Sequence, residues 1–218
     1  MKYPQKNSFS RFVPILLVIV ITIVAVAAVL AIGQALFGGD NNKNQDQEQA
    51  ETVDIGNEAL LSSDSGRSVR LTVRGPIVAD ESHRSYQVTI TPSSRVMTTY
   101  EGYLENEMDT KKYDNNTRAY EELIYALQKR KMMDGRELTA EENDLRGICA
   151  TGKIYMFETL MDNEPVKTLW TSDCSGSKGS ALANVDEIID MFIKQVPDGD
   201  KMASSVGLGI QDSLLFRL

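Results

Sequence analysis

The first pattern along the chain is a long apolar run. Residues 12–39 carry no charge, and the 21 residues of the apolar part, 12–32, read FVPILLVIVITIVAVAAVLAI. At about 1.5 Å per residue such a helix is about 31 Å long, which matches a hydrocarbon core of about 30 Å. A helix also satisfies its own backbone hydrogen bonds where no water is present. The run therefore predicts one transmembrane helix, which we place at residues 12–37.

The charges that flank this run predict its orientation. Lys2, Lys6 and Arg11 precede it, and no acidic residue occurs before Asp40, which opens a stretch rich in Asp, Glu, Asn and Gln. By the positive-inside rule, residues 1–11 form a cytoplasmic tail and the C-terminal part lies outside the cell. The expected location is therefore the cell membrane, with a single span and an extracytoplasmic domain.

A cleaved signal peptide is the alternative interpretation of the same run. Residues 25–27, Ala-Val-Ala, fit a small-x-small cleavage site. Cleavage there would leave a strongly apolar new terminus, which favours an uncleaved anchor. No cysteine precedes Cys149, which excludes a lipoprotein cleavage motif.

A polar stretch separates the apolar run from the rest of the chain. Residues 38–52 read GGDNNKNQDQEQAET, with no aromatic residue and one aliphatic residue, Ala50. Such a segment buries too little apolar surface to offset the entropy lost on ordering. We therefore expect a flexible linker, which we place at residues 38–62. At its end, residues 53–61 fit either a short helix or a docking strand.

Alternation of apolar and polar residues then predicts strands. In residues 68–74, Val69, Leu71 and Val73 lie on one face and Arg70, Thr72 and Arg74 on the other, which is typical of a half-buried antiparallel strand. Residues 86–91 alternate in the same way, and residues 95–103 form the returning strand after a Pro-Ser-Ser turn. A second hairpin has strands at 148–161 and 166–173, joined by a four-residue loop, Asp-Asn-Glu-Pro.

Two segments show the period of an amphipathic helix. In residues 115–133 apolar side chains recur at i, i+3, i+4 and i+7, and an asparagine at either of the first two positions can serve as the N-cap. Residues 182–196 form a single apolar stripe that Pro197 ends. Asn184 followed by Glu187 resembles a capping box at its start.

This order of elements predicts an α+β fold. Strands, helix, strands, helix imply one antiparallel sheet of about five strands with the two amphipathic helices on one face. We assign this domain to residues 63–197, and at about 150 residues the part after the linker is long enough for one core. Residues 198–218 have no clear period, so we expect a loosely ordered C-terminal tail.

Charge narrows the range of partners. The whole chain has a net charge of −8, and the part after Gly39 holds 20 basic and 31 acidic residues, a net charge of −11. Such a domain is repelled by DNA, RNA and anionic lipid, so we expect no nucleic-acid partner.

The two cysteines are predicted to form a disulfide. Cys149 and Cys174 flank the second hairpin in a domain expected on the oxidising side of the membrane. A symmetric hairpin would not pair these two positions, so the bond requires a bulge, for which Gly152 is a candidate, or a strand end that bends back. Two thiols without a neighbouring histidine make no zinc site. We expect no metal and no cofactor.

The sequence shows no catalytic signature. Its single histidine, His83, lies in a loop among acidic residues and serines. Adjacent loop residues rarely meet in triad geometry, and no G-x-S-x-G elbow occurs. We interpret His83 as a solvated loop residue and expect no catalytic residue.

Two basic features are candidate contacts for an anion or an acidic partner. Lys178 lies in the loop 174–180, which leads toward the last helix, where backbone N–H groups can hold an anion. The loop lacks P-loop spacing, and a tethered flexible connection explains it equally well. Arg70 and Arg74 lie on the polar face of one strand. Alternatively, these arginines cover a solvated sheet face or pair with acids of residues 101–122.

The sequences of four segments resemble those of a known group of proteins. RLTVRGPIVADESHRSYQ (70–87), YDNNTRAYEELIYAL (113–127), RGICATGKIYMFETL (146–160) and LWTSDCSGSKGS (169–180) are similar to N-terminally anchored envelope proteins of Saccharibacteria-type bacteria. The resemblance covers most of the domain and the anchor. It implies a bacterial cell-surface setting and assigns no activity and no functional residue.

Two functions from different classes follow. The favoured one is a non-enzymatic, membrane-anchored surface module that binds an envelope protein or a cell-wall component, or assembles with other envelope proteins. The alternative is an envelope hydrolase with an unrecognised active site. A hydrolase would need a deep pocket that gathers His83 or the 174–180 loop with a carboxylate of shifted pKa.

Overall fold

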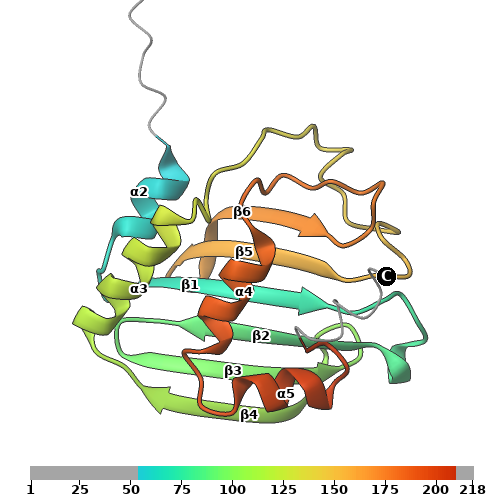
Figure 1. Cartoon of the computed structure of the whole chain (residues 1–218), viewed down its shortest axis with the longest axis horizontal. Helices are drawn as coiled ribbons and strands as arrows, with labels where there is room; N and C mark the ends of the chain where they lie inside the picture. The colour runs from blue at the N-terminus through green and yellow to red at the C-terminus, as the bar shows by residue number, and fades with distance from the viewer. Residues whose placement is uncertain (1–53, 210–218) are drawn as a thin grey trace, which may run out of the picture. The chain divides into compact units, whose positions relative to one another are not determined.

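The computed structural model describes residues 54–209, which form an α+β domain built on one antiparallel sheet (Figure 1). The expected cytoplasmic tail, transmembrane helix and most of the expected linker lie outside the described residues. Among residues 54–209, no helix combines the length and the apolar character needed to cross a bilayer.

The sheet has six strands in the order β4-β3-β2-β1-β5-β6. The strands are β1 (Arg67–Arg74), β2 (Arg84–Ile90), β3 (Ser94–Glu101), β4 (Asn106–Asp114), β5 (Ile154–Met161) and β6 (Glu164–Ser172). The first four form a meander in which each strand pairs with the next. The first strand of the meander, β1, also pairs with β5, so strands distant in sequence meet at the centre of the sheet.

The predicted α+β class is confirmed, but the expectation of about five strands missed β4. Only Tyr113 among the nine residues of β4 is even partly buried. An edge strand with two solvated faces needs no apolar alternation, so period-two analysis cannot detect it. The second hairpin also differs, because Asp162 and Asn163 alone form its turn, both with positive φ, and β6 already begins at Glu164.

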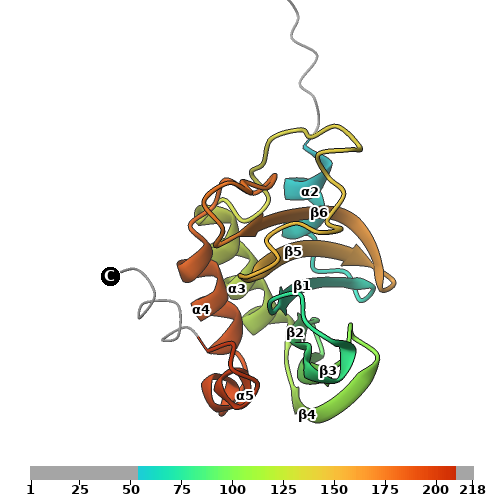
Figure 2. The ribbon, with the colours of Figure 1, turned by 90° about the vertical axis from the view of Figure 1, so that its right-hand side faces the viewer.

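Four α-helices occur in the described part of the chain: α2 (Ile55–Leu61), α3 (Thr117–Lys129), α4 (Val185–Ile193) and α5 (Gly199–Ser205). A short 3-10 helix, η2 (Asp80–Ser82), precedes β2. Figure 2 shows α3 and α4 on the same side of the sheet. The α3 prediction is confirmed in type and cap, because the Asn116 side chain accepts the Ala119 N–H at 3.0 Å. Its four periodic apolar residues, Tyr120, Leu123, Ile124 and Leu127, are all buried.

The main core lies between the sheet and these helices. It joins the apolar faces of β1, β2 and β5 with the apolar stripes of α3 and α4. The strands β1 and β2 and the helix α4 contribute Val69, Leu71, Val73, Tyr86, Val88, Ile90, Ile188, Ile189, Phe192 and Ile193. α4 starts later than expected, at Val185, and Leu182 is 67 % exposed. The predicted capping box is present only as a side-chain pair, in which the Asn184 amide donates to Glu187 at 3.0 Å.

Both ends of the domain are ordered further than predicted. Residues 54–61, assigned to the linker, include α2, whose N-cap Asp54 accepts the Gly56 N–H and whose Leu60 is fully buried. The tail after residue 198, expected to be loosely ordered, contains α5, and its Met202 belongs to the main core. Both α2 and α5 have apolar residues on one face, which explains why these two segments pack against the rest of the domain.

A second, smaller core lies on the opposite face of the sheet. Trp170 of β6 is 3 % exposed, and its indole N–H donates to Asn143 at 2.7 Å. Leu145 and Ile148, which follow in the long connection between α3 and β5, pack in the same cluster. This connection reaches the far face past the β6 edge, where Gly135 bridges to Ala181. It therefore supplies a layer over the part of the sheet that the helices leave uncovered.

Candidate ligand-binding site

The disulfide fixes the end of this connection. Cys149 and Cys174 are bonded, with an S–S distance of 2.11 Å and a Cα–Cα distance of 5.5 Å. The β5–β6 ladder ends at Ile154 and Ser172, so the bond joins the segments that flank the strands. Cys149 has a φ of 51° and lies in a turn closed by the Gly152 N–H. The bent strand end is therefore the correct alternative; the bulge of this hairpin lies at 159/160 instead.

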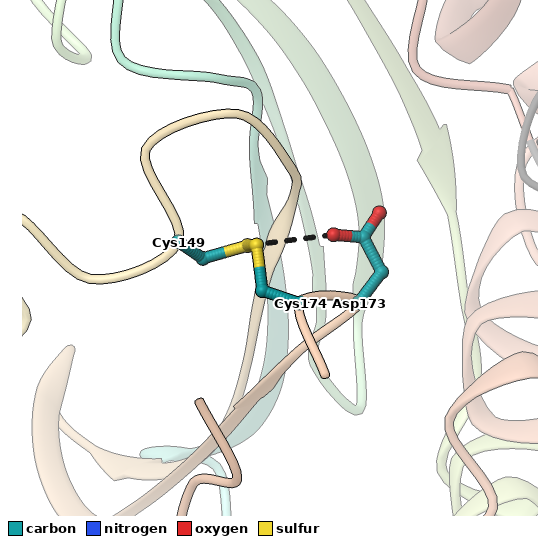
Figure 3. A group of neighbouring side chains, drawn as sticks. All are labelled: Cys149, Asp173 and Cys174. Atoms are coloured by element: carbon teal, nitrogen blue, oxygen red, sulfur yellow. Dashed lines mark hydrogen bonds between the residues drawn. A yellow bond between two sulfur atoms is a disulfide. The ribbon is translucent and has the colours of Figure 1, made fainter. Parts of the chain in front are cut away.

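Asp173 lies against the disulfide (Figure 3). Its Oδ1 accepts the Lys153 N–H at 2.7 Å and is 3.4 Å from the Cys149 Sγ. A sulfur within a disulfide carries no proton, so the short S···O approach is a contact and not a donated hydrogen bond. Cys149, Cys174 and Asp173 are close enough together to hold a metal ion. Both sulfurs are held in the S–S bond, however, so they are not the thiolates that metals require.

A pocket of about 360 Å³ lies beside the disulfide, and we call it the Tyr103 pocket. It is lined by Arg74 and Gly75 at the end of β1, by Ile77, by His83 before β2, by Tyr103 in the β3–β4 loop, by residues 144–149 and by Ile154. The Ile77 N–H donates to the Ala150 carbonyl at 2.8 Å, which ties the loop after β1 to the wall that ends at Cys149. Backbone bonding and the disulfide thus hold this wall in place.

His83 is the most deeply buried polar residue of the pocket. The interpretation as a solvated residue is wrong, because His83 is 1 % exposed and stacks on the Tyr103 ring with centroids 3.9 Å apart. Its Nδ1 lies 3.0 Å from the Gly102 carbonyl oxygen. A carbonyl only accepts, so Nδ1 donates, and in the neutral ring Nε2 then carries a lone pair. Nε2 has no hydrogen-bond partner among residues 54–209.

Arg74 brings a positive charge to the same pocket. Its guanidinium carbon lies 5.8 Å from the centroid of the Tyr103 ring, and no carboxylate in the described part of the chain pairs with it. Arg146, the other cation of the lining, is paired with Asp144. Hydrogen bonds from the Arg146 side chain and backbone lower the pKa of Asp144 to about 2. The Asp144 charge therefore neutralises Arg146, and Arg74 remains as the cation of this lining without a carboxylate.

The other two predicted contact residues lie outside the pocket. The Arg70 guanidinium contacts Glu158 at 2.6 Å, and Glu158 is 4 % exposed. Arg70 thus pairs across the sheet with β5 and not, as one alternative held, with an acid of residues 101–122. Lys178 is exposed, and its loop does not reach the start of α4, because residues 181–184 intervene. The structure does not bring Arg70, Arg74 and Lys178 together.

No protein-family model matches the chain, and no curated protein matches it.

A larger cleft, of about 890 Å³, lies on the other side of the disulfide and is lined in part by Lys153, Asp173 and Asp186. Two of these polar side chains are already engaged, since Asp173 accepts the Lys153 N–H and Lys153 Nζ donates to the Gly209 carbonyl at 3.4 Å. Gly209 is the last described residue. The Tyr103 pocket, which offers an unpartnered nitrogen and an unneutralised cation, is the better candidate site.

Proposed function

We propose that this protein is a membrane-anchored, extracytoplasmic binding module that takes a small organic ligand in the Tyr103 pocket and catalyses no reaction. One observation carries the proposal: His83, 1 % exposed, has an unpartnered Nε2 at a pocket whose other lining is largely apolar. Ligand sites typically combine apolar walls with a few convergent polar groups, in volumes of roughly 300–1,000 Å³. An acceptor without a protein partner at a pocket wall is open to a hydrogen bond from a ligand or from water.

The membrane anchor and the envelope setting are part of the same proposal. The uncharged run at residues 12–39 and the basic residues before it support a single span with the domain outside. The disulfide supports an oxidising compartment, since such bonds persist there and are rare in the cytosol. The membrane would be contacted through residues 12–37, and the ligand would come from, or belong to, the envelope.

A hydrolase fits this pocket less well. A nucleophile activated by His83 would have to hydrogen-bond to its ring, but within residues 54–209 the only hydrogen bond of that ring is to the Gly102 carbonyl. Asp144, the carboxylate of the lining, has a pKa lowered to about 2 by Arg146. A general acid or base needs a pKa closer to the working pH, so Asp144 is suited to an ion pair and not to proton transfer.

A fragment screen tests the binding proposal. The full chain in lipid nanodiscs would be screened by ¹⁹F NMR against fluorinated fragments that include neutral, cationic and anionic members. Ile148→Trp fills the pocket from its wall, and Leu182→Trp adds the same side chain at an exposed position outside it. We expect fragment hits that vanish in Ile148→Trp and persist in Leu182→Trp, with circular dichroism confirming that both variants are folded. Hits that survive in Ile148→Trp, or no hit of any charge, would refute the proposal.

A further inference from the structure

We infer that the ligand of the Tyr103 pocket is a small hydroxylated carboxylate: an organic anion with an apolar body and a hydroxyl group that donates a hydrogen bond. This inference rests on the proposed binding function and names the chemistry of its ligand. Three features of the pocket each require one part of that ligand.

The anionic group follows from Arg74. Its side chain is partly buried, lies over the Tyr103 ring and pairs with no carboxylate among the described residues. The second guanidinium of the lining, on Arg146, is already held by Asp144. The lining thus carries one more positive than negative charge, although the chain as a whole is acidic, with a net charge of −8. A planar guanidinium binds a carboxylate through two parallel hydrogen bonds, which are stronger than neutral ones.

The donor follows from His83. Because Nδ1 is committed to the Gly102 carbonyl, the neutral ring presents Nε2 as an acceptor. A carboxylate alone cannot satisfy an acceptor, since an ionised carboxylate has no proton to donate. A hydroxyl group can, and a site that accepts a hydrogen bond from its ligand discriminates against analogues that cannot donate one.

The apolar body follows from the rest of the wall. The side chains of Ile77, Ile148 and Ile154 line the pocket together with the Tyr103 ring. The volume of about 360 Å³ lies near the lower end of the range for small-molecule sites, which suits a body about as large as one aromatic ring. The disulfide and the Ile77–Ala150 backbone bond hold this wall before any ligand arrives, so little ordering is needed on binding.

Three related probes test the assignment by isothermal titration calorimetry on the full chain in lipid nanodiscs. 4-Hydroxyphenylacetate carries ring, carboxylate and hydroxyl; phenylacetate lacks the hydroxyl; 2-(4-hydroxyphenyl)ethanol lacks the carboxylate. We expect 4-hydroxyphenylacetate to bind tightest, and each of the other two to bind about tenfold more weakly or worse, as the loss of one buried or charge-assisted hydrogen bond implies. Equal affinity for the acid and the alcohol, or no measurable binding of 4-hydroxyphenylacetate, would overturn the inference.

Variants assign each contact. Arg74→Gln is expected to weaken both acids about tenfold and to leave the alcohol unchanged, whereas Lys178→Gln, the same charge change outside the pocket, changes neither. His83→Asn keeps a donor for the Gly102 carbonyl and removes the Nε2 acceptor, so it should abolish the preference for the hydroxylated acid. An Arg74→Gln protein that binds both acids normally would also overturn the inference. If neutral or cationic fragments bind in the pocket while these acids do not, the binding function stands and only this assignment fails.

Discussion

Removal of the disulfide is expected to destabilise the domain strongly. Cys149 and Cys174 lie 25 positions apart, and a cross-link over that length lowers the entropy of the unfolded chain by an amount equivalent to about 3.5 kcal/mol at 25 °C. For a domain of this size, each kcal/mol corresponds to a melting temperature change of about 2–4 °C. We therefore expect the double variant Cys149→Ala/Cys174→Ala to melt about 7–14 °C below the wild type.

Trp170 makes this prediction simple to measure. It is the only tryptophan of the chain and is packed in the same small cluster as Cys149. Urea unfolding followed by Trp170 emission gives the free energy of unfolding for the wild type, the reduced wild type and the double variant. The last two should agree, and a reductant should not change the double variant. The urea dependence of the free energy should also be steeper without the cross-link, because the unfolded chain becomes less compact.

A loss below about 1 kcal/mol would refute the reasoning. It would mean that the unfolded chain keeps residues 149 and 174 close together without the bond. The simplest cause would be a β5–β6 hairpin that persists in the unfolded state, since its ladder ends a few residues from each cysteine.

The remaining predictions concern stability and titration. Replacing Arg70 by Met leaves the Glu158 carboxylate buried without a counter-charge and should lower the free energy of unfolding by about 3–5 kcal/mol. Replacing both residues by Met should restore most of this loss, as measured by urea unfolding in a double-mutant cycle. Equal losses in the single and the double variant would contradict this prediction. A Cβ at Gly179 would lie 2.0 Å from the backbone carbonyl oxygen of the tryptophan in β6, so Gly179→Ala should lower the free energy of unfolding by about 1–3 kcal/mol. Gly176 lies in the same loop with open space around it, so Gly176→Ala should lower it by less than about 0.5 kcal/mol. The carboxyl of Asp144 has a pKa lowered to about 2 by its neighbouring arginine, so its ionised form favours the folded state; this contribution is complete above about pH 4 and is lost as the pH falls toward 2. A ¹³C NMR titration of that carboxyl checks this, and a midpoint near 4 would contradict the ion pair.

The sequence predicts those parts of the fold where one side of an element is buried and the other is solvated. The helix that begins after Asn116 has such faces and was predicted correctly. The strand around Val69, Leu71 and Val73 was also located correctly, although Ser68 and Thr72 on its other face are buried as well. β4 has no buried face and was missed. In α5 the buried positions Gly199, Met202 and Ala203 do follow helical spacing, but the helix is only seven residues long. Longer periodic patterns are needed before spacing alone identifies a helix.

The candidate site was harder to predict because its residues come from four separate segments. Arg74 was predicted as a candidate contact for an anion or an acidic partner, with a solvated sheet face as the alternative, and His83 was predicted to be solvated. The burial of His83 depends on Tyr103, which lies twenty residues later, and on the wall at 144–149. No local pattern encodes such a meeting, because it arises from the β2–β3–β4 meander and from the way the α3–β5 connection passes the β6 edge. The disulfide was predicted because cysteine pairing depends on compartment and number more than on the path of the chain.

The central position of β1 has a consequence for the order of folding. On one side β1 pairs with β2, from which it is separated by a short loop, so little loop-closure entropy opposes this contact. On the other side it pairs with β5, in a register where Arg70 meets Glu158, 88 positions later. We expect the β1–β4 meander to form early and the β5–β6 hairpin to dock on it late, as a unit closed by its own two-residue turn. Until that hairpin arrives, one edge of β1 is open, and the backbone N–H and C=O groups along that edge are unpaired. Newly made chains are therefore most prone to pair with one another during this interval, and the late disulfide then prevents the docked hairpin from reopening.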